Sequence, residues 1–453
     1  MTPFKNNIKR FIHHRTTLLI ALSFVLGGFC TTNLMAQSSL PDTTLSLDEI
    51  VVSATKMEQQ VSETGRSVSV ITRQEIDQST YVNVGQILAR QKGVHMVGSG
   101  QTPGSLQSAF LRNADSDQVV VMIDGIRISD PSSVDNTVNL AELSLANVQR
   151  IEVVRGSHST IFGSSAVGGV INIITKNEGQ PGINAALGTK VGTFGSGTST
   201  ISENSSFSYT SPSGFYTNVS TAWERTQGID ATIDTTGDSQ QFPSSDQDDF
   251  DKLDLTGKAG YNGDSWEGYL AYRRIDQNVD VDNGSFSDDD NAFADFQRHL
   301  ITYGATNAIS ENVELQYIGG FSTLDRLNAN DSSRIDASGN FDGSVSRTST
   351  DATLLENELR ATYRSDHFRT IAGLNSSRQT MNIKTLTIAR AFNFFQETDL
   401  DSLNLDEVIN SFFVHAELGG SLISSRLERF SIGAGLRLLD HDQFGFQSTF
   451  EVN

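Results

Sequence analysis

Apolar and polar residues alternate along most of the chain after residue 182. In Trp266–Gly268–Leu270–Tyr272, apolar or small side chains stand at every second position, which is the period of a β-strand with one buried face. Segments of about ten residues with this pattern predict a long series of strands. The predicted strands are 207–209, 215–223, 253–261, 266–274, 300–308, 313–321, 355–364, 370–376, 412–422 and 430–438.

The connections between these segments alternate in length. Short turns at 210–214, 262–265 and 310–312 alternate with long polar loops at 228–251, 276–297, 328–350 and 382–410. Short turns on one side and long loops on the other are typical of an outer-membrane β-barrel. A soluble β-sandwich is the alternative, but it rarely shows such consistent asymmetry. Residues 182–453 are therefore expected to be strands of a transmembrane antiparallel β-barrel.

Residues 47–178 show a different, mixed pattern. SVSVIT (67–72) alternates like a strand, and Thr72 stands three residues before Glu75, the spacing of a capping box that starts a helix. Val84, Ile87 and Leu88 then follow at helical spacing. Strands are predicted at 94–97, 109–112 and 119–123, a hairpin turn at Asp124-Gly125, and a short helix at 140–148. Together these elements predict a compact α+β domain.

The stretch 148–176, VQRIEVVRGSHSTIFGSSAVGGVINIITK, is expected to fold as strand, tight loop, helical turn and strand. Its two apolar ends are rich in Val and Ile, and its middle is rich in Gly and Ser. Arg150, Glu152 and Arg155 interrupt the first strand. We expect these charges to pair or to face water, because an unpaired buried charge is costly.

The first 36 residues are expected to be a cleaved secretory signal. A basic start is followed by the apolar run 18–29 and by a small-residue edge at Met35-Ala36. The run is shorter than the about 20 residues that span a bilayer, and a buried core helix is the alternative. Cys30 is the one cysteine of the chain, so an exported product must be stable without disulfides.

The net charge and the absence of catalytic motifs exclude two classes of function. The formal net charge of −21 makes nucleic acid an unsuitable partner, because phosphate contacts need clustered Lys and Arg. The sequence contains no nucleophile elbow, no phosphate-binding loop and no His-Glu-x-x-His zinc motif. We therefore expect no catalytic residues and no enzymatic activity.

Two stretches carry a resemblance to a known family. VVVMIDGIRI (119–128) and the stretch 148–176 resemble the plug signature of TonB-dependent outer-membrane receptors, with Ser157 and Phe162 as departures where proline and tyrosine are common. The resemblance implies an α+β plug domain inside a barrel of about 22 strands. It divides the chain into a signal peptide (1–36), an N-terminal segment (37–56), the plug (57–178) and a partial barrel (182–453). Because the predicted strands supply only part of such a barrel, we expect the sequence to be truncated at its C-terminus.

The resemblance also implies a TonB box, the segment that pairs with the periplasmic energy-coupling protein TonB. It would consist of Leu47, Asp48, Glu49, Ile50, Val51, Val52, Ser53, Ala54 and Thr55. A short β-prone run near a mature N-terminus can add to the edge of a partner's sheet. An ordinary first strand is the alternative from pattern alone.

Within the family, the chain is most similar to the cobalamin receptors. The similarity lies in RQEIDQSTYVNVGQIL, LAELSLANVQRIE, TQGID and GLRLLDHDQFG. It implies that five plug residues lie near a corrinoid ligand, and Asn113 departs from the glycine that usually follows the plug arginine. The implied ligand-binding residues are Leu106, Ser108, Asp115, Ser133 and Val134.

Acidic stretches in the predicted long loops are candidate Ca²⁺ ligands. Carboxylates at alternating positions can converge on Ca²⁺, which takes six to eight oxygens, and the resemblance to cobalamin receptors implies calcium there. A solvated acidic surface is the alternative. The candidate ligands are Asp230, Asp246, Asp248, Asp276 and Asp280.

The expected function is TonB-dependent import of a scarce, large ligand, a cobalamin or related corrinoid, across the outer membrane of a Gram-negative cell. Its expected partners are TonB, the small-molecule ligand and outer-membrane lipid. A ferric siderophore or haem receptor is the alternative within the family, and a non-transporting surface adhesin is the alternative from another class.

Overall fold

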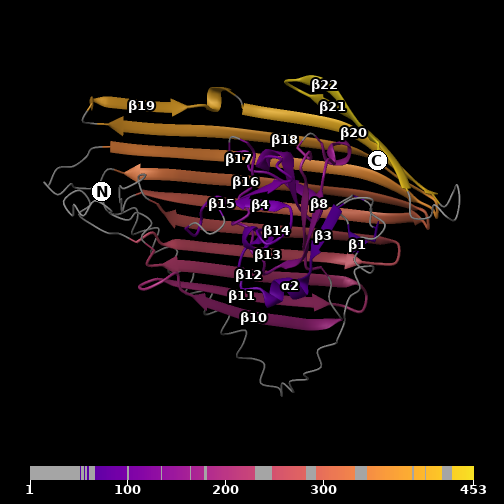
Figure 1. Cartoon of the computed structure of the whole chain (residues 1–453), viewed down its shortest axis with the longest axis horizontal. Coiled ribbons are helices and arrows are strands. Elements are labelled where there is room, and N and C mark those ends of the chain that lie inside the picture. The colour runs from indigo at the N-terminus through magenta and orange to yellow at the C-terminus, as the bar shows by residue number, and fades with distance from the viewer. Residues whose placement is uncertain are drawn as a thin grey trace, which may run out of the picture. The chain divides into compact units, whose positions relative to one another are not determined.

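The computed structural model describes one compact unit within Leu47–Asn453, in which the plug packs on a large sheet (Figure 1). We use "plug" for its described residues between 67 and 177. The ranges described are 51–52, 56, 59–60, 67–98, 102–133, 135–163, 165–177, 181–229, 247–281, 292–331, 344–389, 392–403, 405–420 and 431–452.

The plug is built around a five-stranded mixed sheet in the order β3-β8-β9-β6-β7. Neighbours in this order pair antiparallel, except β6 and β9, which run parallel. A separate hairpin joins β4 to β5. The elements are β3 (Ser67–Ile71), α2 (Arg73–Gln78), α3 (Val84–Leu88), β4 (Val94–Val97), β5 (Ser108–Leu111), η3 (Ser116–Gln118), β6 (Val119–Ile123), β7 (Ile126–Ile128), β8 (Val148–Arg155), α4 (Ser159–Phe162) and β9 (Gly169–Thr175).

Local sequence signals explain most plug elements. The Thr72 hydroxyl accepts a hydrogen bond from the Glu75 N–H, and the Glu75 carboxylate accepts one from the Thr72 N–H, which confirms the capping box. Asp124 and Gly125 both adopt positive φ, at 50° and 82°, as the predicted hairpin turn requires. The order strand, loop, helical turn and strand over 148–176 is also confirmed, with α4 as the helical turn.

The short helix predicted at 140–148 is wrong. The Asn139 side-chain oxygen accepts hydrogen bonds from the N–H groups of Gln107 and Ala141, and the Ser144 N–H donates to Asp254 of the large sheet. Side chains therefore satisfy backbone groups that a helix would have used. The apolar residues of this segment are spaced so that they are buried without a helix, since Leu140 and Leu143 are each 1% exposed.

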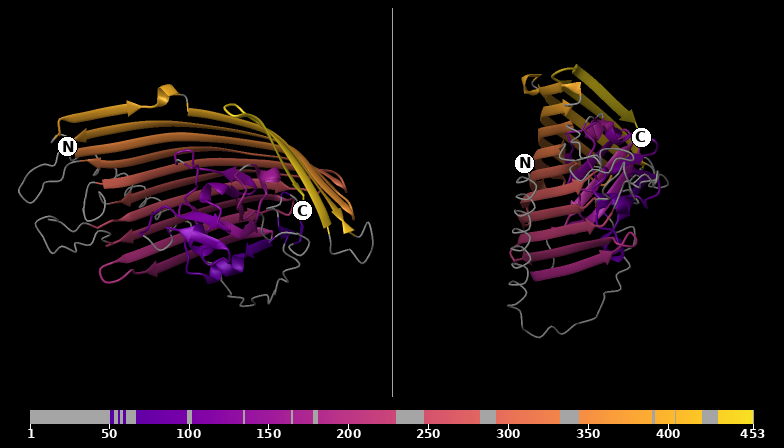
Figure 2. Two further views of the ribbon diagram at one scale, coloured as in Figure 1. Left: turned by 45° about the horizontal axis from the view of Figure 1, so that its top comes forward. Right: turned by 90° about the vertical axis from the view of Figure 1, so that its left-hand side faces the viewer.

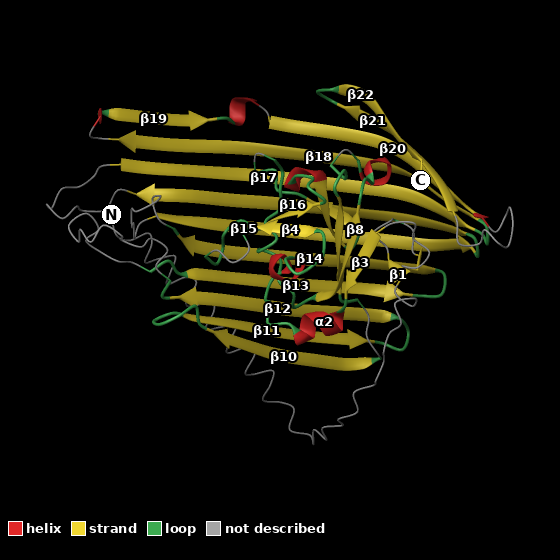
Figure 3. Ribbon diagram, in the orientation of Figure 1, coloured by secondary structure: helices red, strands yellow, loops and turns green. Residues whose placement is uncertain are grey.

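The other large part of the fold is an antiparallel sheet, which has 13 strands among the described residues (Figure 3). Consecutive strands pair in order, and β19 pairs only with β18. The strands are β10 (Gly182–Gly192), β11 (Ser199–Thr210), β12 (Phe215–Gln227), β13 (Phe250–Asn262), β14 (Trp266–Asp280), β15 (Ala292–Ser310), β16 (Val313–Asp331), β17 (Ser344–Arg364), β18 (Phe368–Ala389), β19 (Phe394–Asp399), β20 (Leu405–Gly419), β21 (Ser431–His441) and β22 (Gly445–Val452). A 3₁₀ turn, η5 (Asp401–Leu403), precedes β20.

The two faces of this sheet differ. The face toward the plug carries buried polar and charged side chains such as Asp254, Arg298 and Glu358, and the opposite face carries exposed large apolar ones such as Leu270, Tyr317 and Phe412. Figure 2 shows the plug on one face of the strands. An apolar face of this extent needs an apolar environment. The alternation predicted from the sequence is confirmed.

The strands are longer than the sequence pattern predicted. β14 continues to Asp280, β16 to Asp331 and β18 to Ala389, within ranges predicted as long loops. On β14 the outer positions become polar beyond Tyr272, while the hydrogen-bonded ladder continues, as in the pairing of Asp276 with Gln297. Hydropathy therefore marks the apolar band and not the ends of the strands. No helix in the described part of the chain has the length and apolar character needed to cross a membrane.

Candidate functional site: the junction of plug and sheet

Lys56, directly after the predicted TonB box, is fixed to the large sheet. Its backbone adopts φ of 61° between β1 (Val51–Val52) and β2 (Gln59–Gln60), two short paired strands. Its buried ammonium donates to the Glu358 carboxylate on β17. The same ammonium lies 4.8 Å from the ring centre of Phe162 in the plug and 4.6 Å from that of Phe413 in the sheet. One side chain therefore joins three parts of the chain.

The Lys56 ammonium is held in an unfavourable environment. Burial lowers the pKa of Lys56 from 10.5 to about 8, although the Glu358 carboxylate opposes this, and the charges of Arg437 and Arg360 lower it further. With a pKa of about 8 the ammonium is still mostly protonated at neutral pH, and its desolvation reduces the net stability that the pair contributes.

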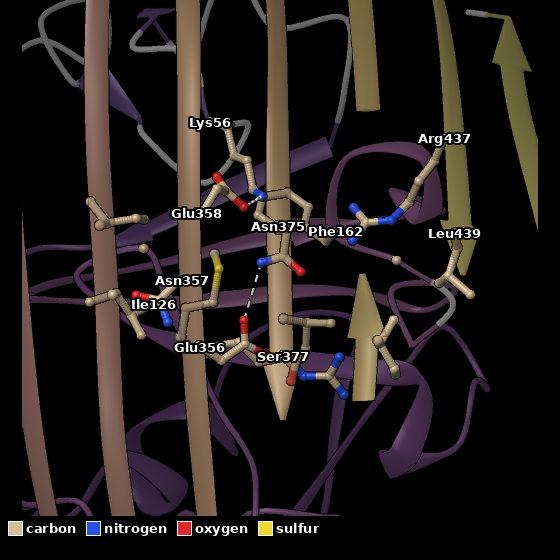
Figure 4. A pocket seen from close by; sticks show the side chains of 18 residues that line it. Lys56, Ile126, Phe162, Glu356, Asn357, Glu358, Asn375, Ser377, Arg437 and Leu439 are labelled. Atoms are coloured by element: carbon tan, nitrogen blue, oxygen red, sulfur yellow. Dashed lines mark hydrogen bonds and ion pairs between the residues drawn. The ribbon is translucent and has the colours of Figure 1, made fainter. Parts of the chain in front are cut away.

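A small cavity, which we call the seam, surrounds this pair (Figure 4). It has a volume of about 60 Å³ and lies between the plug and strands β16 to β21. Glu356, Asn375 and Ser377 line it together with Lys56 and Glu358. The Asn375 amide donates to the Glu356 carboxylate at 3.2 Å. A volume of this size admits about two waters, and apolar side chains such as Ile126, Ile318 and Leu439 line it beside the charged and amide groups.

The β6–β7 turn makes a second charged contact with the sheet. The Asp124 carboxylate accepts from the Lys258 ammonium at 2.7 Å and from the Thr175 hydroxyl and N–H at 2.6 and 2.8 Å. Burial by itself would raise the pKa of Asp124, but the Lys258 charge and these hydrogen bonds hold it below its usual value. The turn residue predicted from the sequence is therefore also an anchor.

Residues 129–145 of the plug form the third contact, which we call the loop junction. Arg298 of β15 pairs with Glu142 at 2.9 Å and donates to the Ser129 carbonyl at 3.1 Å. Arg326 of β16 pairs with Asp130 at 2.5 Å. Burial raises the pKa of Glu142 above its usual value, although the Arg298 guanidinium opposes this. Both members of the Glu142–Arg298 pair are 1% exposed in their side chains.

Two further sheet residues hold the same loop. The Lys252 ammonium donates to the Ala141 carbonyl at 2.9 Å, and Asp254 accepts from the Ser144 N–H at 3.1 Å. Arg273 orients Asp254 through a hydrogen bond of 2.9 Å. None of these sheet residues was predicted as functional. Their signal in the sequence is a charge at an inward position of an alternating strand, which is costly unless a partner meets it.

The predicted ligand-binding residues that the structure describes lie in different settings. Asp115 is exposed and directly precedes η3, and Ser133 lies in a turn closed by hydrogen bonds to Asp130 and from Asn136. Asp135 accepts from the Ser133 hydroxyl at 3.3 Å and, at 3.5 Å, from the hydroxyl of Ser116, the residue after Asp115.

The remaining candidates differ in exposure. Leu106 is 54% exposed, whereas Ser108 is buried in β5 at 7%. Val134 lies outside the described residues. The ligand-binding role of all five residues stays a prediction.

A second cavity, the plug cavity, lies beside Asp115 and Ser133. It has a volume of about 280 Å³ and is lined mostly by polar side chains, among them Asp117, Arg127, Asp135, Thr137 and Ser165. Space of this size between polar groups accommodates about nine waters. The plug therefore contains a hydrated interior region next to the predicted ligand residues.

The predicted calcium ligands are not assembled in the described residues. Asp276 lies on β14 and not in a loop, and it is bound in two places by Arg274, at 2.8 and 3.0 Å. It does not fit a metal ligand. Asp280 also lies on β14, where its N–H donates to the Asp249 carbonyl, and Asp248 is buried beside that residue. The described residues contain no group of three His, Cys, Asp or Glu that could hold a metal ion. Asp230 and Asp246 lie outside them.

The predicted TonB box is only partly described. Val51 and Val52 form β1, and residues 47–50 and 53–55 lie outside the described part. Of the charges on β8, Arg150 and Glu152 pair as predicted, at 2.8 Å. Arg155 differs from the prediction, because it is buried and donates to the neutral Ser69 hydroxyl, at 2.8 Å.

Comparisons with known proteins agree with this architecture. Residues 60–170 match the family model of the TonB-dependent receptor plug domain. A region of 166 residues is 39% identical to the vitamin B12 transporter BtuB of Vibrio cholerae serotype O1, covering 37% of this chain and 26% of that protein.

Solved structures match over more of the chain. The unliganded ferric citrate transporter FecA aligns with a TM-score of 0.61 at 16% identity, covering 87% of this chain and 60% of that one. The ferric preacinetobactin receptor BauA of Acinetobacter baumannii aligns with a TM-score of 0.64 at 11% identity, covering 89% and 62%. At these identities the likeness concerns the fold. The chain thus covers only about three-fifths of the length of these neighbours.

Three findings agree on the same kind of protein. They are the match to the plug model, the similarity to a transporter over the plug region and the shared fold. The described residues contain that plug and a 13-stranded antiparallel sheet. The chain therefore contains a TonB-dependent receptor plug domain at residues 60–170 and, over most of its length, shares the fold of the solved transporters and receptors.

Proposed function

We propose that the chain belongs to an active importer that takes up cobalamin or a related corrinoid through the outer membrane. The observation that carries the transport proposal is the Lys56–Glu358 pair, because it fixes the residue next to the predicted TonB box to the sheet through a buried charged contact. A pull by TonB on residues 47–55 would act first on this pair. No covalent chemistry is part of the proposal.

The corrinoid assignment is supported by the similarity to a vitamin B12 transporter at 39% identity over 166 residues. A ferric siderophore is the second candidate, because the solved neighbours include a ferric citrate transporter and a ferric preacinetobactin receptor. Those likenesses are at 16% and 11% identity and concern the fold. We therefore place cobalamin first.

The test separates binding from transport. Cells that produce the receptor, and cells whose receptor lacks Leu47–Thr55, are given labelled cyanocobalamin and a labelled ferric siderophore. We expect both receptors to bind cyanocobalamin and only the intact one to accumulate it. Binding of the siderophore alone would overturn the corrinoid assignment. Equal accumulation by both receptors, or binding without accumulation by either, would contradict TonB-dependent import.

We further propose that Ca²⁺ orders the outer loops through Asp230, Asp246, Asp248 and Asp280. Asp276 is left out, because the Arg274 guanidinium occupies both of its oxygens. If the proposal is right, millimolar Ca²⁺ protects the loops from protease and strengthens cyanocobalamin binding, and replacing Asp230 and Asp246 by Asn removes both effects. The variant Asp276→Asn is the matched control and should respond to Ca²⁺ like the parent. Protection that is equal with and without Ca²⁺ would contradict the proposal.

A further inference from the structure

The outer face of the large sheet, which is the face away from the plug, carries a groove of about 500 Å³. We call it the outer groove. It crosses strands β16 to β22, and large exposed aromatic side chains such as Tyr317, Phe412 and Phe446 line it. A volume of this size lies in the range of ligand-binding pockets.

The register of the strands explains the groove. Polar side chains stand opposite one another on β17, β18, β20 and β21, in the row Asn357, Ser376, Asn410 and Asp440. The adjacent row on the same face carries larger apolar side chains, which are Leu359, Leu374, Phe412 and Leu438. Residues that pair directly share one face of a sheet. Short polar side chains therefore run beside a row of tall apolar ones, and the difference in height forms the groove.

The polar row lies at one border of the apolar band. On β20 the outward positions on one side of Asn410 are all apolar, from Phe412 to Leu418 in steps of two. Leu418 pairs with Phe368, directly after the short connection 365–367. On the other side of Asn410 the strand leads toward the predicted long loop. Since long loops of outer-membrane barrels lie outside the cell, the polar row lies at the level of the outer-leaflet head groups.

The polar row offers hydrogen bonds at this border. Asn357 Oδ1 accepts from the hydroxyls of Tyr303 and Tyr317, both at 2.7 Å, which leaves its amide N–H groups as donors. Asn410 Oδ1 accepts from the Ser376 hydroxyl at 2.8 Å, and both of these residues are exposed. Polar groups that face lipid tails without partners are costly. A lipid head group with hydroxyl and amide groups would satisfy them.

The charge of the groove disfavours a phosphate. Asp440 adds an exposed carboxylate to the polar row. Arg378 stands in the next row toward the long loops, but both oxygens of Asp406 bind its guanidinium, at 3.2 and 2.6 Å. A carboxylate and amides accept hydrogen bonds from sugar hydroxyls and repel or do not attract an anion. The groove therefore fits a sugar head group.

We propose that the outer groove binds one glycolipid of the outer leaflet. Its sugar hydroxyls bond to Asn357, Asn410 and Asp440, and an acyl chain lies over the apolar row beside them. The groove is continuous with the apolar face of the sheet, so a membrane lipid reaches it without leaving the bilayer. The proposal goes beyond transport and does not depend on which ligand is imported.

The test measures which lipid stays on the receptor. The full-length receptor is extracted from outer membranes in a mild detergent, and native mass spectrometry counts the retained lipids. We expect about one glycolipid on the parent. The double variant Asn410→Leu, Asp440→Leu should retain about fivefold less, as expected for lost hydrogen bonds. Asn307→Leu is the matched control, because Asn307 lies opposite Trp266 on the same face but outside the groove.

Reconstitution separates loss of binding from a folding defect. In phosphatidylcholine nanodiscs the double variant should unfold at the same temperature as the parent, because leucine suits lipid contact. Added lipid A should then raise the unfolding temperature of the parent and of Asn307→Leu, and not that of the double variant, since a ligand stabilises the state that binds it. If the double variant unfolds early, Asn410→Leu alone takes its place.

Three results would overturn the proposal. The first is equal retention of glycolipid by the parent and the double variant. The second is retention of phospholipids alone. The third is a receptor dimer that carries no glycolipid and that the double variant dissociates, which would make a second copy the occupant of the groove.

Discussion

The loop junction and the seam connect the same two bodies in different ways. At the loop junction, Leu140 and Leu143 belong to one apolar cluster with Ile275 and Leu300 of the sheet. Two arginines, a lysine and an aspartate of the sheet reinforce that cluster. At the seam, charged and amide side chains are mixed with apolar ones, such as Ile126, Ile318 and Leu439, around a cavity of about 60 Å³.

The difference indicates which contact holds and which one yields. The loop junction joins plug and sheet through a buried apolar cluster, which ion pairs reinforce. At the seam, the joining ion pair contains a lysine whose charge is disfavoured by burial, and it borders an open cavity. We infer that the loop junction retains the plug on the sheet while the seam opens. The following predictions test this contrast.

The largest effect is expected from Arg298→Met, which removes the partner of Glu142. Breaking a buried pair from one side costs about 3–5 kcal/mol, so the plug should become protease-sensitive at a markedly lower urea concentration. Receptors in outer membranes, digested across a urea series, provide the measurement. The matched control is Arg378→Met, whose exposed pair with Asp406 should contribute almost nothing.

The double variant Glu142→Gln, Arg298→Met sharpens this test. With the unpaired charge gone, most of the lost stability should return. If the double variant is as unstable as the single one, packing of the arginine stem and not the charge explains the loss.

A smaller loss is expected from Leu143→Ala. This side chain is 1% exposed, and truncating a buried leucine costs about 3 kcal/mol through the cavity that remains. Leu106→Ala, at a side chain that is 54% exposed, should leave the urea midpoint unchanged. Equal midpoints for the two variants would contradict an apolar loop junction.

The smallest effect concerns the seam and depends on pH. Docked Lys56 has a pKa of about 8 and released Lys56 the ordinary 10.5, so between these values the released form binds more protons. Raising the pH therefore favours the docked form, and the released fraction should fall about tenfold between pH 7 and 9. A spin label at Thr55→Cys, followed by its mobility, reports this fraction.

Lys56→Arg is the control for the pH experiment. A guanidinium keeps its charge throughout this range, so the mobility of the label should not change with pH. A fall in the parent that is matched by this variant would assign the effect to another group.

Much of the fold could be predicted from the sequence, because its signals are local. The Thr72–Glu75 capping box, the Asp124-Gly125 turn and the alternation in Trp266–Tyr272 each lie within a few residues. The ends of the strands could not be predicted, since beyond Tyr272 the ladder of β14 continues without apolar side chains on its outer face. The 140–148 segment failed as a helix because Asn139 and a distant residue, Asp254, satisfy its backbone.

The candidate site was harder to predict, because its pairs join residues far apart in the chain. Lys56 and Glu358 are separated by 302 positions, and Arg298 contacts the Ser129 carbonyl across 169. No local pattern contains such a pair. An inward charge on an alternating strand marks where a partner is needed, but its identity requires the register of the whole sheet.

The lengths of the strands have a consequence for how such receptors can diverge. β17 and β18 have 21 and 22 residues, whereas about 9–11 residues cross a bilayer. About half of each strand is therefore free of the lipid constraint. Because side chains alternate with a period of two, deleting two residues from each partner keeps every remaining side chain on its face. The length of these strands beyond the bilayer can therefore change by two residues at a time, while the plug contacts near Glu358 stay as they are.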